Sequence, residues 1–156
     1  MKTNIPIYLR SISLFALLTF LPVIVRAQEG LQIAGLFDKY GERTDVTRVE
    51  LNGGILKSYR MTTYKSLVFK NITPYQQVIQ QAIARDKQNN VKKAQEVMEN
   101  GILRSAYYQL EEVKRNGKIL NRYIIFKIGK ASMGTLIYIE GSLGEKEMLE
   151  MLYKPQ

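Results

Sequence analysis

The stretch of sequence that decides the fold is YYQLEEVKRNGKILNRYIIFKI, residues 107–128. At its centre, Asn116-Gly117 separates two runs that are rich in β-branched and aromatic residues. Both central residues of a type I′ hairpin turn need a positive φ, and Asn-Gly meets that need at little steric cost. A two-residue loop places Val113 opposite Leu120 and continues through four further pairs: Leu110–Tyr123, Glu111–Arg122, Tyr108–Ile125 and Tyr107–Phe126. One of these pairs joins opposite charges, which supports the register, so the stretch predicts a β-hairpin.

Around this hairpin the sequence predicts a larger antiparallel sheet. Large apolar side chains occupy both faces of residues 120–128, which is typical of a central strand covered on both sides. Residues 134–141 are expected to form the next strand. Ahead of the hairpin, Asn100-Gly101 predicts a turn that follows another strand at residues 94–99. Extension of the preceding helix is the alternative for that segment.

Three segments have the apolar spacing of helices. The first covers residues 28–40 and is ended by Gly41. The second begins at Thr73-Pro74, where the Thr hydroxyl can cap the helix and Pro occupies the first helical position. The third covers residues 145–153 and presents apolar residues to the sheet.

Two further β-favouring runs, at residues 45–51 and 66–70, predict strands in the first half of the chain. A turn is expected at residues 52–54, and residues 55–64 fit either a short helix or an extended segment. We therefore expect an α+β domain, in which an antiparallel β-meander sheet of about four to five strands packs with two to three helices.

Residues 1–27 have the pattern of a secretory signal peptide. A basic start without acidic residues precedes an apolar run over residues 11–25, which is shorter than the roughly 20 residues of a membrane-spanning helix. Val25-Arg26-Ala27 fits a cleavage site, so we expect cleavage before Gln28 and a single mature domain over residues 28–156. An uncleaved anchor is the alternative. Cleavage would leave no spanning segment and would place the protein in the periplasm or outside the cell.

The composition excludes several kinds of catalysis. The chain has no Cys and no His, which excludes disulfides, thiol nucleophiles, Cys/His zinc sites and Ser-His-Asp mechanisms. The remaining candidates for acid–base catalysis are three carboxylate pairs: Glu96 with Glu99, Glu111 with Glu112, and Glu147 with Glu150. Each pair is expected to be a solvated surface feature. We therefore predict no catalytic residue, no cofactor and no metal.

The formal net charge is +9, and the basic residues gather in two groups. The first, at the tip of the predicted hairpin, comprises Lys114, Arg115, Lys118 and Arg122. The second comprises Lys57, Arg60, Lys65 and Lys70, interleaved with Tyr59 and Tyr64. Such groups can bind polyanions, and for an exported protein we expect anionic glycans or lipid headgroups rather than nucleic acid. The alternative is that these residues protect sheet edges and maintain solubility.

Several motifs together resemble small exported Bacteroidetes proteins that are grouped as domains of unknown function. The motifs are QEGLQI (28–33), LFDKY (36–40), VTRV (46–49), NRYI (121–124) and LIYIEG (136–141). The resemblance implies an α+β domain and a periplasmic or secreted location. It carries over no catalytic residue, because none is assigned in that family.

Taken together, these features predict an exported, non-enzymatic binding protein whose partner is a protein or another cell-envelope component. The alternative is a binder of anionic glycans or lipid headgroups through the basic hairpin residues. An enzyme that uses only carboxylates, Lys or Tyr ranks third.

Overall fold

The computed structural model describes residues 30–153, and the predicted signal peptide and its cleavage site lie outside these residues. Six strands form one sheet: β1 (Val46–Leu51), β2 (Met61–Phe69), β3 (Val91–Glu99), β4 (Ile102–Arg115), β5 (Lys118–Ile128) and β6 (Gly134–Gly141). The α-helices are α2 (Gln32–Tyr40), α3 (Gly54–Ser58), α4 (Gln76–Asn90) and α5 (Glu145–Tyr153), and a short 3-10 helix covers Lys130–Ser132. The predicted α+β class is confirmed, with one or two more strands and helices than expected.

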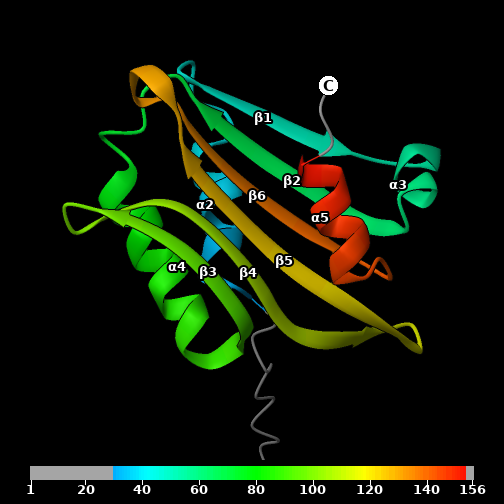
Figure 1. Cartoon of the computed structure of the whole chain (residues 1–156). Coiled ribbons are helices and arrows are strands. Elements are labelled where there is room, and N and C mark those ends of the chain that lie inside the picture. Colours follow the sequence, from blue (N-terminus) through cyan, green and yellow to red (C-terminus); the bar gives the residue numbers. More distant parts are fainter. Residues whose placement is uncertain (1–29, 154–156) are drawn as a thin grey trace, which may run out of the picture.

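The strand order is β1-β2-β6-β5-β4-β3, and every neighbouring pair is antiparallel. β1 and β2 form a first hairpin connected through α3. Helix α4 then carries the chain from β2 to the opposite edge of the sheet, and β3 to β6 return as a meander until β6 pairs with β2 (Figure 1). The meander therefore accounts for four strands, and the first hairpin extends the sheet to six.

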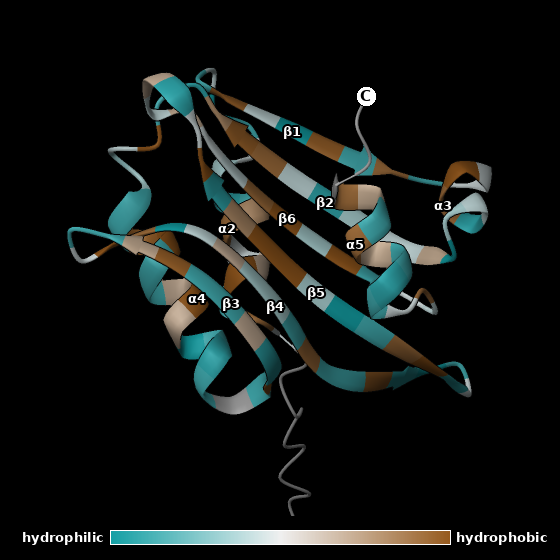
Figure 2. Ribbon diagram, viewed as in Figure 1, coloured by the Kyte–Doolittle hydropathy of each residue, from teal (hydrophilic) through white to brown (hydrophobic). Residues whose placement is uncertain are grey.

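The sheet has an apolar core on each face. Helices α2 and α4 cover one face, and α5 lies on the other beside the short α3 (Figure 1). Along β5, Ile124 and Phe126 point to the α2/α4 side, whereas Tyr123 and Ile125 point to the α5 side. Hydrophobic segments recur along the inner strands in Figure 2. This confirms the prediction that β5 is central and covered on both faces. Each large apolar side chain buried in this way stabilises the fold by roughly 1.5–3 kcal/mol.

The predicted turn of the β4–β5 hairpin is confirmed, but most of its register is wrong. Asn116 and Gly117 have φ values of 49° and 77°, as a type I′ turn requires. Val113 pairs with Leu120 as expected. Beyond it a β-bulge shifts the register by one residue, so the four predicted pairs Leu110–Tyr123, Glu111–Arg122, Tyr108–Ile125 and Tyr107–Phe126 do not form.

The bulge has a packing reason. In the uninterrupted register Gln109 would lie opposite Ile124, on the face that packs against α2 and α4. With the bulge, Tyr108 pairs with Ile124 instead, and Gln109 pairs with Tyr123 on the other face. One extra residue in β4 thus places Tyr108 rather than the polar Gln109 in this core.

Of the other local predictions, some are confirmed and one is wrong. Strand β3 confirms the strand expected at 94–99, and α5 has the predicted bounds. Residues 55–64 contain the end of a helix and the start of a strand, so each open alternative describes part of the segment. Helix α4 begins at Gln76 without a side-chain cap, and the N–H of Thr73 donates to the Asn71 side chain (3.0 Å), so the predicted Thr73 cap is wrong.

Within residues 30–153, no helix has the length and apolar character needed to cross a membrane.

Candidate functional site

Two adjoining hollows lie at the end of the sheet where β4 turns into β5. The first, of about 580 Å³, lies between α2 and the sheet, and the second, of about 530 Å³, lies beside α3. They share three lining residues, Thr62, Lys118 and Leu120. Because they share these residues, we treat the two adjacent hollows as one candidate site.

One wall of the first hollow is the apolar side of α2. It consists of Leu31, Ile33, Ala34 and Phe37, and Leu120 on β5 also lines the hollow. All of these except Ala34 are buried. This wall is therefore an apolar surface, formed by the same periodic pattern that predicts the helix.

A carboxylate from another helix holds the start of α2 in place. The backbone N–H groups of Gln32 and Ile33 donate to the two side-chain oxygens of Asp86 on α4, at 2.6 and 3.0 Å. Burial raises the pKa of Asp86, while these two N–H groups lower it. Asp86 satisfies two N–H groups that a helix N-terminus leaves unpaired, and it thereby positions the apolar wall.

The opposite wall carries a buried carboxylate that already has partners. Glu140 on β6 is 3% exposed. Its Oε1 accepts from Nε of Arg115 at 2.7 Å, and its Oε2 accepts from the hydroxyl of Tyr138 at 2.9 Å. Burial and the neighbouring carboxylate raise the pKa of Tyr138, so this phenol keeps its proton. Arg122 lies directly opposite Glu140 in the β5–β6 register and adds a second positive charge nearby.

Cationic side chains line both hollows. Lys65 and Lys118 lie at the first, and Lys57, Arg60 and again Lys118 lie at the second. Arg60 pairs with Glu147 at 2.7 Å, and Nζ of Lys65 lies 3.4 Å from Glu50. Among the described residues, Lys57 and Lys118 form no ion pair, and both are exposed. These two ammonium groups are therefore available to a ligand.

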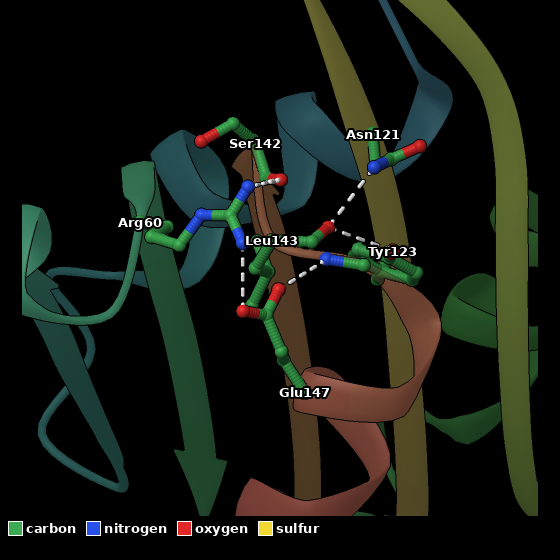
Figure 3. A network of polar contacts seen from close by, with 7 residues as sticks. Arg60, Asn121, Tyr123, Ser142, Leu143 and Glu147 are labelled. Carbon is green, nitrogen blue, oxygen red and sulfur yellow. Dashed lines mark hydrogen bonds and ion pairs between the residues drawn. The ribbon is translucent and has the colours of Figure 1, made fainter.

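The turn between β6 and α5 fixes one side of the second hollow (Figure 3). Arg60 donates to the carbonyl of Ser142 at 3.0 Å and to Glu147. The carbonyl of Leu143 accepts from Asn121 and from the hydroxyl of Tyr123, at 3.0 and 3.1 Å. The N–H of Gly144 and the guanidinium of Arg60 lower the pKa of Glu147. The network joins the α3–β2 connection, β5, the β6–α5 turn and α5, and so positions this edge of the hollow.

The structure separates the four residues of the predicted anion site. Arg115 and Lys118 line the first hollow, whereas Lys114 is exposed outside both hollows. Arg122 is 7% exposed, and its Nε donates to the backbone carbonyl of Glu111 at 2.8 Å instead of pairing with that carboxylate. The register shift explains this contact, because it places Arg122 beside the bulge.

From the second predicted basic group, Lys57, Arg60 and Lys65 line the hollows, and Lys70 does not. Sequence reasoning missed Glu140, Tyr138 and the α2 wall. The one available signal was a single acidic residue inside the apolar strand 134–141, two residues after a tyrosine on the same face. Two basic groups that are distant in sequence are thus brought to one site.

The carboxylates of the three predicted pairs line neither hollow, and five of the six pair with a cationic side chain. Glu112 pairs with Lys92 (2.9 Å), Glu96 with Lys87 (2.6 Å), and Glu99 with Arg104 (3.0 Å). Among the residues that the structure describes, Glu140 is the only carboxylate that lines the first hollow, and none lines the second. No cluster of His, Cys, Asp or Glu that could hold a metal ion occurs within residues 30–153.

Comparisons with known proteins place the chain in a family without giving it an activity. Among solved structures, the crystal structure of PA94, a protein of unknown function from Pseudomonas aeruginosa, aligns at 12% sequence identity with a TM-score of 0.32. That alignment covers 70% of this chain and 76% of PA94. No curated protein matches the chain. The family of unknown function DUF6108 matches residues 20–152, nearly the whole of the described structure, and the chain belongs to this family.

Proposed function

We propose that the chain is a non-catalytic binding protein, exported through residues 1–27, that takes ligands carrying negative charge at the two hollows. Such ligands would be cell-envelope components. The proposed site retains Arg115 and Lys118 at the hairpin tip. It includes Lys57 and Lys65 in place of the predicted Lys114 and Arg122.

The observation that carries this proposal is the convergence of positive charge. Lys57 comes from α3, Lys65 from β2 and Lys118 from the β4–β5 hairpin, yet all three line one or both of two adjacent hollows. Cations gathered around a concave, partly apolar surface focus positive potential there and raise the local concentration of anions. A purely solubilising role would not require such a gathering.

The chemistry of Glu140 supports binding rather than catalysis. Both of its side-chain oxygens are engaged, by Arg115 and Tyr138. A retaining or inverting glycosidase needs a second facing carboxylate. Among the described lining residues of the two hollows, Glu140 has no such partner.

The test uses the purified protein with two anionic probes, a heparin hexasaccharide and octyl phosphate. Desulfated hexasaccharide, which keeps only its uronate carboxylates, is the control of lower charge. The variant Lys57→Ser/Lys118→Ser is compared with Lys127→Ser/Lys130→Ser, which removes the same charge from exposed positions outside the hollows. We expect at least one anion to bind at low salt and to be lost only in the first variant, and salt to weaken binding because the lysines are exposed. Equal binding by both variants, or no anion binding at all, would refute the proposal.

A protein partner is the second candidate, favoured by the free edge of the sheet. β3 is an edge strand, and Val97 and Met98 are 59% and 55% exposed, with Ile102 exposed beside them at the hairpin tip. Exposed edges of this kind accept an added strand from a partner. Val97→Lys should abolish capture of one defined partner from envelope extract, whereas Lys57→Ser/Lys118→Ser should not. Retention of that partner by Val97→Lys would exclude the edge.

A further inference from the structure

We infer that the ligand is a single-chain amphiphile: its alkyl chain lies in the first hollow and its phosphate or carboxylate headgroup lies at Lys118 and Lys57. This inference rests on the proposed function and specifies its ligand class.

The first hollow has the size and lining of a site for an alkyl chain. Its volume of about 580 Å³ is within the roughly 300–1,000 Å³ that is usual for small-molecule sites. Side chains of α2 and the buried Leu120 on β5 supply apolar surface from two separate elements. An alkyl chain between them would exchange contact with water for contact with apolar side chains, which is the main source of affinity for such ligands.

Three polar residues on the opposite wall of this hollow already have hydrogen-bond partners within the protein. The carboxylate of Glu140 is neutralised by Arg115 and accepts a second hydrogen bond from Tyr138. Thr62 donates its hydroxyl to the backbone carbonyl of Glu140 at 3.0 Å. An alkyl chain passing these groups leaves these three hydrogen bonds intact, so the atoms that form them keep their protein partners.

The second hollow supplies the recognition of the headgroup. It meets the first at Thr62, Lys118 and Leu120, so a chain that leaves the apolar hollow there emerges beside Lys118. Lys57 lies on the far side, on α3. Arg60 is held by Glu147 and by the Ser142 carbonyl, so it shapes the hollow, while the two unpaired lysines are left to donate to the anion. A phosphate or carboxylate accepts such charge-assisted hydrogen bonds strongly.

The decisive measurement is the affinity of butyl, hexyl, octyl and decyl phosphate, below their micelle concentrations, by isothermal titration calorimetry. We expect affinity to rise by up to about fourfold for each methylene, until the chain outgrows the hollow. Equal affinity across the series would overturn the inference. If the heparin hexasaccharide still binds and is lost in Lys57→Ser/Lys118→Ser, the proposed function nevertheless stands.

A matched pair of α2 variants locates the chain. Ala34 lines the first hollow, whereas its exposed neighbour Gly35 does not, and both sit on the surface of the same helix. Ala34→Phe should fill the hollow and reduce decyl phosphate affinity at least tenfold, while Gly35→Phe leaves it unchanged. Binding of the heparin hexasaccharide serves as the check that Ala34→Phe is folded and keeps its lysines in place. If both variants bind decyl phosphate like the parent protein, the chain does not lie in the first hollow and the inference fails.

Discussion

At the scale of single residues, the backbone conformation of the two Asn-Gly turns matters most for the strands that they connect. Gly101 and Gly117 have φ values of 75° and 77°, and Asn100 and Asn116 precede them at 51° and 49°. These are left-handed conformations that Gly adopts without strain and Asn adopts more readily than most residues. Both turns lie at hairpin ends, so each sets the register from which its strands grow.

Gly117→Val should therefore destabilise the protein more than Gly144→Val. A β-branched residue at a φ of 77° is strained by on the order of 1–3 kcal/mol. At Gly144 no positive φ is required, and a Cβ there would lie 3.8 Å from the nearest side-chain atom. Urea unfolding of the two variants measures the difference. Equal free energies of unfolding would show that the turn conformation is not under this constraint.

At the scale of elements, the helices depend on contacts made far away in the sequence. The N-terminus of α2 is capped by Asp86 on α4, and the N-terminus of α5 carries Glu147, which pairs with Arg60 beyond α3. Neither contact could be predicted from local spacing. The helices themselves could be, because their apolar periodicity is local, whereas the groups that dock them depend on the order of the strands.

The Asp86 cap gives a prediction for α2. Asp86→Ala should lower the free energy of unfolding by about 1 kcal/mol, because two N–H groups at the start of α2 lose their acceptor. Removing the carboxylate also removes the cost of burying it, the same cost that raises the pKa of Asp86. This gain offsets part of the loss, but the two N–H groups remain without an acceptor. Asp38→Ala, an exposed change on α2, is the control. Unchanged amide hydrogen exchange in α2 of Asp86→Ala would contradict the cap.

The Glu147 contacts give a prediction for α5 and pH. The N–H of Gly144 and the guanidinium of Arg60 hold the pKa of Glu147 below its ordinary value of 4.5. A lowered folded-state pKa adds stability that is present above pH 4.5 and lost as the pH falls through the lowered value. Glu147→Gln should therefore reduce the melting temperature relative to the parent protein at neutral pH, and the gap should close in acid. A gap that is independent of pH would assign the contact no electrostatic role. Glu150→Gln, which alters an exposed pair at 3.9 Å, provides the comparison.

The β4–β5 hairpin shows where prediction from sequence succeeds and where it stops. Its turn depends on two residues and was predictable, as was the two-sided burial of β5. The bulge was not, because its advantage is that it turns Tyr108 rather than Gln109 toward the core face, and that face is defined only when α2 and α4 are in place. The same holds for the candidate site. The basic residues were visible in the sequence, but the pairing of Arg115 with Glu140 requires β6 to lie beside β5.

At the scale of the whole molecule, the exported form is predicted to begin at Gln28. The basic start, the apolar run over residues 11–25 and the Val25-Arg26-Ala27 sequence motivate this prediction. N-terminal mass spectrometry of protein recovered outside the cytoplasm measures it directly. A recovered species that retains residues 11–25 would instead indicate an anchor.

The place of β6 in the sheet has a consequence for the order of folding. β6 lies between β2 and β5, and its pairing with β2 runs from Phe69–Gly134 to Met61–Gly141. Until this strand has been synthesised, β1–β2 is an isolated two-stranded hairpin, which is marginally stable in water, and it has no pairing with β3, β4 and β5. Closing such distant pairings also carries a large entropic cost before any contact offsets it. The two halves of the sheet can therefore be joined only after β6 has been synthesised.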